Sequence, residues 1–375
     1  MTPFAITAPG RILFGRGEAG QAPAILRSFG PRGVIVHGAN AARAAWLVGA
    51  LGPEVLALPC AGEPTLDDLL TALQVVKGYR PDWVAALGGG AALDMGKALA
   101  ALIPAPDGPM QHLEVVGKGL PLVADPLPFI AIPTTSGTGA EVTRNAVIGL
   151  PEHGRKVSLR DERMVARVAI VDPGLTDGCP RGITLASGLD AVTQVIEPFV
   201  SCKATPYTVA LARPAIGPGL AALMRLMEGE DAGARDRLAW VSLCGGLALS
   251  NGGLGAAHGL AGVIGGVTGA AHGAICGALL GPVLAANLAA ANGEAHRRLV
   301  EVCGILGGVL GCGADEAPQV LQDWARGAGL PGLQDLGVRA HMHAEIVTAS
   351  LSASSMKGNP VPLDPGTLRR VLELA

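Results

Sequence analysis

The sequence predicts a mostly parallel α/β domain over residues 1–179 and an all-α domain over residues 180–375. Three observations support this division. Short apolar runs alternate with amphipathic segments in the first half, helix-length segments replace them after "DPGLTDGCP", and 375 residues exceed what one hydrophobic core usually holds. We place the boundary near Cys179 to Arg181.

Five runs rich in apolar and β-branched residues predict strands, at 33–38, 54–60, 82–90, 129–135 and 167–173. Between the first three strands, residues 39–51 and 65–79 have the apolar spacing of amphipathic helices. A strand–helix–strand order predicts a parallel sheet covered on both faces, and ligands bind such sheets at the carboxyl ends of the strands.

From about Arg181 onward, alanine, leucine and glycine dominate and strand-like runs disappear. Residues 238–293 contain no Lys, Arg, Asp or Glu, which is long enough to raise the question of membrane spans. Recurring glycines, two histidines and the break at "LSNGG" instead favour helices buried within a soluble all-helical domain.

Composition predicts a protein that acts on a small soluble ligand. The net charge of −3 gives no electrostatic reason to bind nucleic acid or an anionic membrane. Seven scattered cysteines without a C-x-x-C pair predict reduced thiols, and the N-terminal residues lack the pattern of a signal peptide. We therefore expect a cytoplasmic protein.

Two glycine-rich loops follow predicted strands. In "LGGGAALDMGKALA", residues Gly88, Gly89 and Gly90 allow close backbone approach, and the helix that follows presents free N–H groups to a phosphate. A plain strand-to-helix turn is the alternative, because the glycines do not match G-x-G-x-x-G. In "IPTTSGTGAEVT", Thr134, Thr135, Ser136 and Thr138 supply hydroxyl groups where a nucleotide could be held.

Two segments of the second half carry candidate metal ligands. Asp190 and Gln194 are four residues apart, so on a helix they share a face, although Asp190 alone is more often a helix cap. His258 and His272 enclose the apolar run "HGLAGVIGGVTGAAHG", and their spacing suits two successive helices that each provide one ligand. The alternative is a pair of core histidines with hydrogen-bond partners.

Together these segments resemble the iron-containing (group III) alcohol dehydrogenase family, which is related to maleylacetate reductase, glycerol dehydrogenase and dehydroquinate synthase. "GGGAALDMGKA" is similar to the family loop G-G-G-S-x-x-D-x-x-K, and "PTTSGTGAEVT" is similar to P-T-T-x-G-T-G-S-E-V-T. "VDPGLT", the Asp190 helix and the two histidines follow in the family order. The resemblance covers most of the chain.

The resemblance implies a dehydroquinate synthase-like fold, with a Rossmann-like nucleotide-binding domain before a helical metal and substrate domain. It implies a homodimer that transfers hydride between NADP or NAD and a small alcohol, aldehyde or ketone, assisted by divalent iron or zinc. The implied metal ligands are Asp190, Gln194, His258 and His272, and we predict no catalytic residue beyond them. The implied cofactor-binding residues are Gly38, Gly88, Gly89, Gly90, Asp94, Thr134, Thr135, Thr138 and Lys156.

Three departures from the family pattern modify these expectations. Gln194 replaces a histidine ligand by an amide, which predicts weak or absent metal binding. This keeps open a metal-independent keto-acid reductase similar to maleylacetate reductase, or a non-catalytic nucleotide-binding homologue. Gly262 replaces a histidine that serves relatives as a proton relay. Gly38 stands where NAD-preferring relatives have aspartate, and nearby His37 and Arg43 could contact a phosphate, which favours NADPH.

Overall fold

A computed structural model describes residues 3–375, which form two compact units. The α/β unit comprises Thr7–Thr135 and Ala140–Thr176. The helical unit comprises Asp177–Ala375, the loop Ser136–Gly139 and the described residues up to Ile6. The α/β unit ends at Thr176, three residues before the boundary predicted from the sequence. The sequence did not predict that Ser136–Gly139 belongs to the helical unit.

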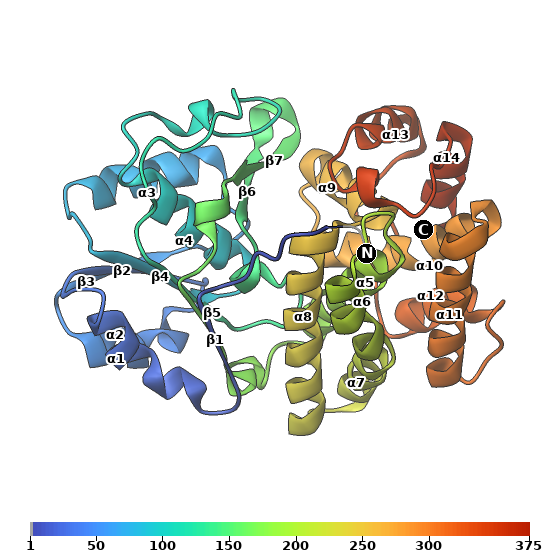
Figure 1. Ribbon diagram of the computed structural model, residues 1–375, viewed down its shortest axis with the longest axis horizontal. Coiled ribbons are helices and arrows are strands. Elements are labelled where there is room, and N and C mark those ends of the chain that lie inside the picture. Colours follow the sequence, from blue (N-terminus) through green and yellow to red (C-terminus); the bar gives the residue numbers. More distant parts are fainter. Residues whose placement is uncertain (1–2) are drawn as a thin grey trace. The chain divides into compact units, whose positions relative to one another are not determined.

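A parallel six-stranded sheet with the order β1-β8-β5-β4-β2-β3 forms the centre of the α/β unit (Figure 1). Its strands are β1 (Arg11–Phe14), β2 (Gly33–His37), β3 (Val55–Pro59), β4 (Trp83–Gly88), β5 (Phe129–Pro133) and β8 (Val168–Val171). All five predicted strands are present, and the predicted parallel α/β class is confirmed. The α-helices of this unit are α1 (Ala22–Arg27), α2 (Ala45–Leu51), α3 (Leu66–Lys77) and α4 (Gly90–Leu102).

Strand periodicity explains how both faces of this sheet are covered. In β2, Val34 and Val36 belong to the core that includes residues of α3 and α4, whereas Ile35 belongs to the core that includes residues of α1 and α2. Successive side chains of a strand point to opposite faces, so an uninterrupted apolar run fills both cores. Figure 1 shows the two helix pairs on opposite sides of the sheet.

Two strand pairings were not predicted. β1 pairs in parallel with β8 at the sheet edge, and an antiparallel hairpin joins β6 (Asn145–Leu150) to β7 (Arg155–Arg160). β1 has four residues and begins with arginine, so it lacks the apolar run of a central strand. In β6, buried and half-buried residues alternate, as expected for a strand with one covered face.

Ten α-helices and no strand make up the described part of the helical unit, which confirms the predicted all-α class. They are α5 (Arg181–Val200), α6 (Pro206–Ala212), α7 (Ile216–Glu228), α8 (Ala232–Gly252), α9 (Ala256–Thr268), α10 (His272–Ala290), α11 (Gly293–Leu310), α12 (Ala317–Gly327), α13 (His343–Leu351) and α14 (Pro365–Leu374). Helix α5 packs against α7, α8 and α10, and every residue from Gly188 to Val200 is buried. A helix that is apolar on nearly all sides belongs inside a helical core.

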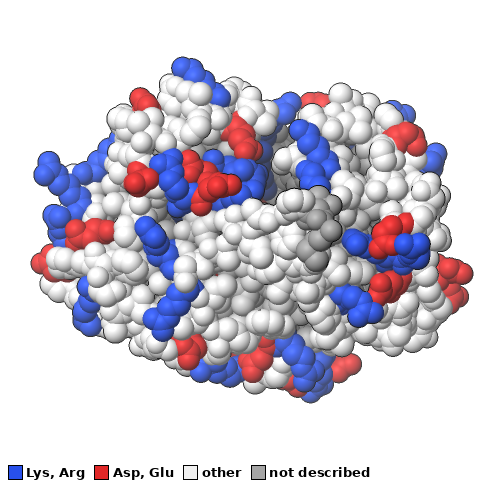
Figure 2. Space-filling model, in the orientation of Figure 1, with Lys and Arg blue, Asp and Glu red and all other residues white. Residues whose placement is uncertain are grey.

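By length and composition, two segments of the described chain are apolar enough to cross a membrane, Pro206–Glu228 and His272–Ala290. The bent pair α8 and α9 adds a third when counted as one span. In the structure 67% of the His272–Ala290 window is buried, and its side chains form part of the helical core. On the molecular face drawn in Figure 2, basic and acidic side chains are interspersed.

Candidate metal and nucleotide sites

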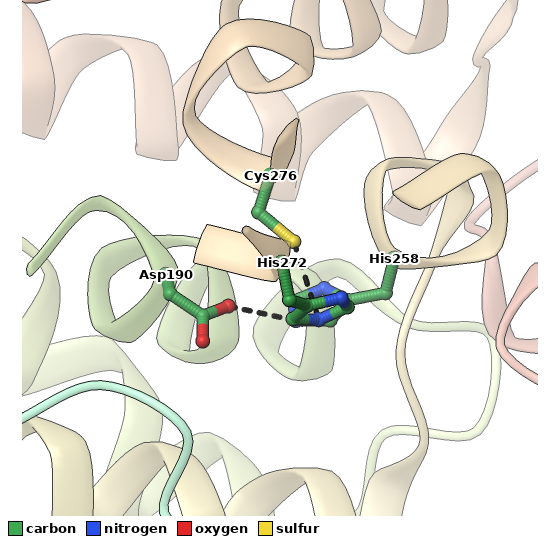
Figure 3. Close-up of side chains that lie close together, drawn as sticks. All are labelled: Asp190, His258, His272 and Cys276. Carbon is green, nitrogen blue, oxygen red and sulfur yellow. Dashed lines mark hydrogen bonds and ion pairs between the residues drawn. The ribbon is translucent and has the colours of Figure 1, made fainter. Parts of the chain in front are cut away.

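Three helices of the helical unit bring four metal-ligating side chains together (Figure 3). Asp190 lies on α5, His258 on α9, and both His272 and Cys276 lie on the first two turns of α10. One ligand atom from each residue lies within 4.8 Å of all the others. Within residues 3–375 this is the single such group of at least three His, Cys, Asp or Glu side chains. The spacing of fourteen residues between the histidines thus corresponds to the two successive helices α9 and α10.

A glycine allows α10 to begin directly beside α5. A Cβ atom on Gly273 would lie 2.5 Å from the carbonyl oxygen of Ala186 and 3.3 Å from the Cβ of Asp190. The first of these distances is too short for any side chain, so the two helices approach this closely only because residue 273 is glycine. The close approach places His272, the first residue of α10, next to Asp190.

Several polar atoms of this cluster are buried without a hydrogen-bond partner. They are Oδ1 and Oδ2 of Asp190, Oε1 of Gln194 and Nε2 of His258. Nε2 of His258 lies 3.3 Å from Oδ1 of Asp190, as an ion-pair contact without hydrogen-bond geometry. Each unpaired buried polar group costs about 1–3 kcal/mol. A divalent cation would satisfy these atoms together, so the residues present fit a metal ion.

Glu197, one further turn along α5 from Gln194, holds the His258 ring in place. Its Oε2 accepts a hydrogen bond from Nδ1 of His258 at 2.7 Å, and its Oε1 accepts one from the backbone N–H of Ala257 at 2.8 Å. In the neutral ring this hydrogen bond keeps the proton on Nδ1, so Nε2 has its lone pair on the side of Asp190. Metal-binding histidines in proteins are typically oriented by a carboxylate in this manner.

The electrostatics of the cluster favour positive charge. Burial alone would raise the pKa of Asp190, but the nearby His258 and His272 rings outweigh burial and hold it below its usual value. Burial alone would lower the pKa of both imidazoles. Negative charge on Cys276 and on the surrounding carboxylates raises the pKa of His272 to about 9 and that of His258 well above 6.5. The cluster therefore stabilises cations.

The structure brings together the three predicted ligands Asp190, His258 and His272. The Gln194 side chain interacts with Asp190, and its amide oxygen is buried. The sequence did not single out Cys276 or Glu197 as site residues. Cys276 follows His272 by four residues, which is one face of a helix, and Glu197 is an isolated carboxylate within the apolar segment "QVIEPFV". The spacing of Cys276 and the isolated position of Glu197 were visible in the sequence. Neither feature showed that Cys276 lies beside the metal ligands or that Glu197 binds His258.

A second candidate site lies at the carboxyl ends of adjacent strands in the α/β unit. Gly38 follows β2, Gly88 ends β4, and a Cβ on Gly88 would lie 3.2 Å from the backbone nitrogen of Gly38. The backbone N–H of Thr134, after β5, donates to the Gly88 carbonyl at 2.9 Å. Gly89, the N-cap residue of α4, would place a Cβ 3.3 Å from the Thr135 hydroxyl. The N-terminus of α4 is therefore surrounded by glycines and hydroxyl-bearing residues. Free backbone N–H groups at a helix N-terminus in such a setting can bind a phosphate.

The remaining predicted cofactor residues lie in other settings. Asp94 forms an ion pair at 3.3 Å with the buried ammonium of Lys97. Lys156 lies on β7 and forms an ion pair with Glu63. Thr138 belongs to the Ser136–Gly139 segment of the helical unit.

The expectation that His37 is available to a phosphate is wrong. Its ring is 6% exposed, and its Nδ1 lies 2.7 Å from the carbonyl oxygen of Gly38, so the ring is held inward. Arg43 is exposed and its guanidinium donates to the carbonyl oxygen of Leu175. His37 and Arg43 thus both bind other parts of the chain. The preference for NADPH then depends on Gly38 alone, where a Cβ would meet no heavy atom within 4 Å.

Comparison with known proteins agrees with this arrangement. Residues 9–173 match the model of the iron-containing alcohol dehydrogenase family, and residues 184–375 match its C-terminal domain. A 4-hydroxybutyrate dehydrogenase of Cupriavidus necator is 32% identical over 302 residues, which cover 78% of this chain and 77% of the relative. A probable alcohol dehydrogenase, EutG of Escherichia coli, is 38% identical over 54% of this chain. The match spans about half the length of that relative, 51%.

Solved structures extend the likeness to the whole chain. Sulfoacetaldehyde reductase from Bifidobacterium kashiwanohense, in complex with NAD+, has a TM-score of 0.86 at 26% identity, and the match covers 100% of this chain and 98% of the reductase. An iron-containing alcohol dehydrogenase from Thermococcus thioreducens has a TM-score of 0.87 at 25% identity, with 99% and 98% of the two chains covered. Members of this family use NAD(P) and a metal. The chain belongs to the iron-containing alcohol dehydrogenase family.

Proposed function

We propose that the protein is an NAD(P)-dependent oxidoreductase that interconverts a small alcohol with its aldehyde or ketone, assisted by a divalent metal. The observation that carries this proposal is the cluster of Asp190, His258 and His272 in a member of this family, in which unpaired buried atoms of Asp190 and His258 converge. When bound, the metal supplies Lewis-acid polarisation of the carbonyl oxygen and the nicotinamide supplies the hydride.

Residues of this chain would bind the metal and the cofactor. Asp190, His258 and His272 would hold the ion, and Glu197 keeps the His258 lone pair directed toward it. The glycines at Gly88–Gly90 and the hydroxyl groups of Thr134 and Thr135 would receive the cofactor phosphates. Gly262 has no side chain that could transfer a proton, and a Cβ there would meet no heavy atom within 4 Å, which leaves room for water. Solvent water is then the proposed proton source.

We also propose that the enzyme is a cytoplasmic homodimer. Support comes from the family resemblance and from the cysteines, because all seven are free thiols, as suits a reducing compartment. Light scattering coupled to size-exclusion chromatography would measure the subunit number. A monomeric mass would overturn the dimer.

The direct test of the activity is NADPH and NADH consumption by the purified protein with a panel of substrates. The panel should include short aliphatic aldehydes, sulfoacetaldehyde and keto acids, and the reverse reaction should be followed with 4-hydroxybutyrate. We expect turnover that a chelator abolishes and a divalent metal restores. Chelator-resistant reduction of keto acids would instead support the metal-independent alternative. Nucleotide binding without any turnover would support a non-catalytic homologue.

For the cofactor, we propose that NADPH is used at least as well as NADH, and that Gly38→Asp reverses this preference. Residue 38 follows β2, and a Cβ there would meet no heavy atom within 4 Å, so the substitution should be tolerated. An aspartate at this strand end accepts hydrogen bonds from the ribose hydroxyls and repels a 2′-phosphate.

We expect kcat/KM for NADPH to fall by about 10- to 100-fold, equivalent to about 1.4–2.8 kcal/mol, with little loss for NADH. Gly38→Asn is the matched control, because it adds the same volume without the charge. If Gly38→Asp and Gly38→Asn have equal effects on both cofactors, charge at residue 38 does not select the cofactor.

A further inference from the structure

Cys276 lies in a setting unlike that of the other buried cysteines of the helical unit. Its side chain is inaccessible to solvent, and its Sγ lies 3.5 Å from Nε2 of His272, one turn earlier on α10. Figure 3 shows the sulfur directed toward the two imidazoles. Cys303 belongs to the same helical core, but there burial raises the pKa of its thiol to about 11, whereas the Cys276 sulfur faces an imidazole nitrogen.

Two of the distances between donor atoms around Cys276 match those of a tetrahedral metal site. Metal–nitrogen and metal–oxygen bonds of about 2.0–2.1 Å and a zinc–sulfur bond of about 2.3 Å give ligand-to-ligand distances of about 3.3–3.6 Å in a tetrahedron. The distance from His258 Nε2 to Asp190 Oδ1 is 3.3 Å, and that from Cys276 Sγ to His272 Nε2 is 3.5 Å. These two pairs share no atom, so they can form opposite edges of one tetrahedron, and all four ligand atoms lie within 4.8 Å of one another.

We propose that Cys276 binds the metal as a thiolate and completes an Asp190, His258, His272 and Cys276 ligand set. The inference rests on the metal centre of the proposed function and concerns its fourth ligand. On binding, the thiol proton is released to solvent and a metal–sulfur bond forms, without any change of oxidation state. The Gln194 amide, which the family resemblance made the fourth ligand, then lies outside the ligand set, and its NH2 group can donate to Asp190.

The choice of ligand affects which metal is held. A neutral amide oxygen is a hard and weak donor, whereas a thiolate is soft and favours zinc over ions that prefer oxygen ligands. With Cys276 bound, the site has one sulfur, two imidazole nitrogens and one carboxylate oxygen, a set typical of zinc. We therefore expect zinc to bind more tightly than iron(II), despite the family's designation.

Spectroscopy with cobalt(II) tests the inference without reference to activity. The full-length protein, stripped of metal under reducing and anaerobic conditions, is titrated with Co(II). We expect one equivalent to produce a thiolate-to-cobalt charge-transfer band in the near ultraviolet, together with the intense visible bands of a tetrahedral ion. Zinc should displace this spectrum at lower concentration than iron(II). Stoichiometric Co(II) binding without the charge-transfer band would overturn the proposal.

Substitutions test whether the charge-transfer band arises from the sulfur of Cys276. In Cys276→Ser we expect the charge-transfer band to disappear and Co(II) affinity to fall at least about tenfold. Loss of a residue that merely orients a metal ligand typically lowers affinity about 10- to 100-fold, and loss of a direct ligand should lower it at least as much. Cys303→Ser is the matched control, since Cys303 is equally buried in the same unit, and it should keep the band. Persistence of the band in Cys276→Ser would overturn the proposal. Gln194→Ala should also keep the band.

A measurement on the unmodified protein covers the case in which Cys276→Ser does not fold. X-ray absorption at the zinc edge of the zinc-loaded protein should show one sulfur about 2.3 Å from the ion. A zinc environment made of nitrogen and oxygen ligands alone would contradict the proposal. An intact charge-transfer band in a protein without turnover would contradict the proposed function and leave the ligand assignment standing.

Discussion

Asp190→Asn is expected to lower kcat/KM by about 1,000-fold or more, while cofactor binding stays within about twofold of the unmodified protein. Asp190 is the carboxylate of the cluster with both oxygens buried and free of hydrogen bonds. Asparagine keeps its shape but removes the negative charge that holds a cation. The polarisation that a bound metal contributes amounts to several kcal/mol, and each 1.36 kcal/mol is a factor of ten in rate.

Three measurements check this expectation. Steady-state kinetics gives kcat/KM, elemental analysis gives the metal content, and the fluorescence of bound NADPH reports cofactor affinity. Asp172→Asn is the control for losing a buried carboxylate elsewhere, because Asp172 accepts hydrogen bonds from the backbone of Gly17, Ala19 and Gly174 in the α/β unit. That control should keep its metal. An Asp190→Asn enzyme with full metal content and undiminished turnover would show that this carboxylate is no ligand.

Glu197→Gln is expected to weaken metal binding by about 10- to 100-fold, although Glu197 does not itself belong to the ligand group. The glutamine oxygen can still accept from the N–H of Ala257, which turns its NH2 group toward Nδ1 of His258. Nδ1 must then accept a hydrogen bond, so the ring proton moves to Nε2. A protonated Nε2 has no lone pair for a metal.

Glu197 is therefore a positioning residue, and its test needs a measurement that separates positioning from general stability. Nitrogen NMR of the metal-free protein, at a pH high enough to leave the His258 ring neutral, should report the proton on Nε2 in Glu197→Gln and on Nδ1 in the unmodified protein. Saturating metal should restore much of kcat, and metal-free Glu197→Gln should keep a cooperative unfolding transition, because the substitution is isosteric. Unchanged metal affinity together with a shifted tautomer would refute the coupling.

The fold could be predicted where the pattern of apolar residues is strong. Fully buried strands such as β4 and β5 are continuous apolar runs, and their strand–helix–strand order implies parallel pairing. β1 could not be found this way, because a four-residue edge strand is specified by its partner β8 rather than by its own pattern. The Ser136–Gly139 segment likewise depends on contacts with distant residues, such as the approach of Gly139 to Gly246.

The candidate site was predictable in part for a similar reason. Asp190, His258 and His272 stood out because polar side chains are rare in their apolar segments and because they match a family pattern. Cys276 did not stand out, since a buried cysteine usually behaves as a small apolar residue. Its role depends on the direction in which α10 leaves Gly273, and that direction follows from the packing of α10 on α5.

The metal ligands lie on three separate helices, α5, α9 and α10, so a bound metal should stabilise the folded protein. An ion bound there acts as a cross-link between chain segments from residue 190 to residue 276, and it restricts the unfolded chain much as a covalent bridge would. Metal supply in the cell would thereby influence how long this half of the chain survives proteolysis. Starvation for the ion should deplete the protein itself as well as its activity.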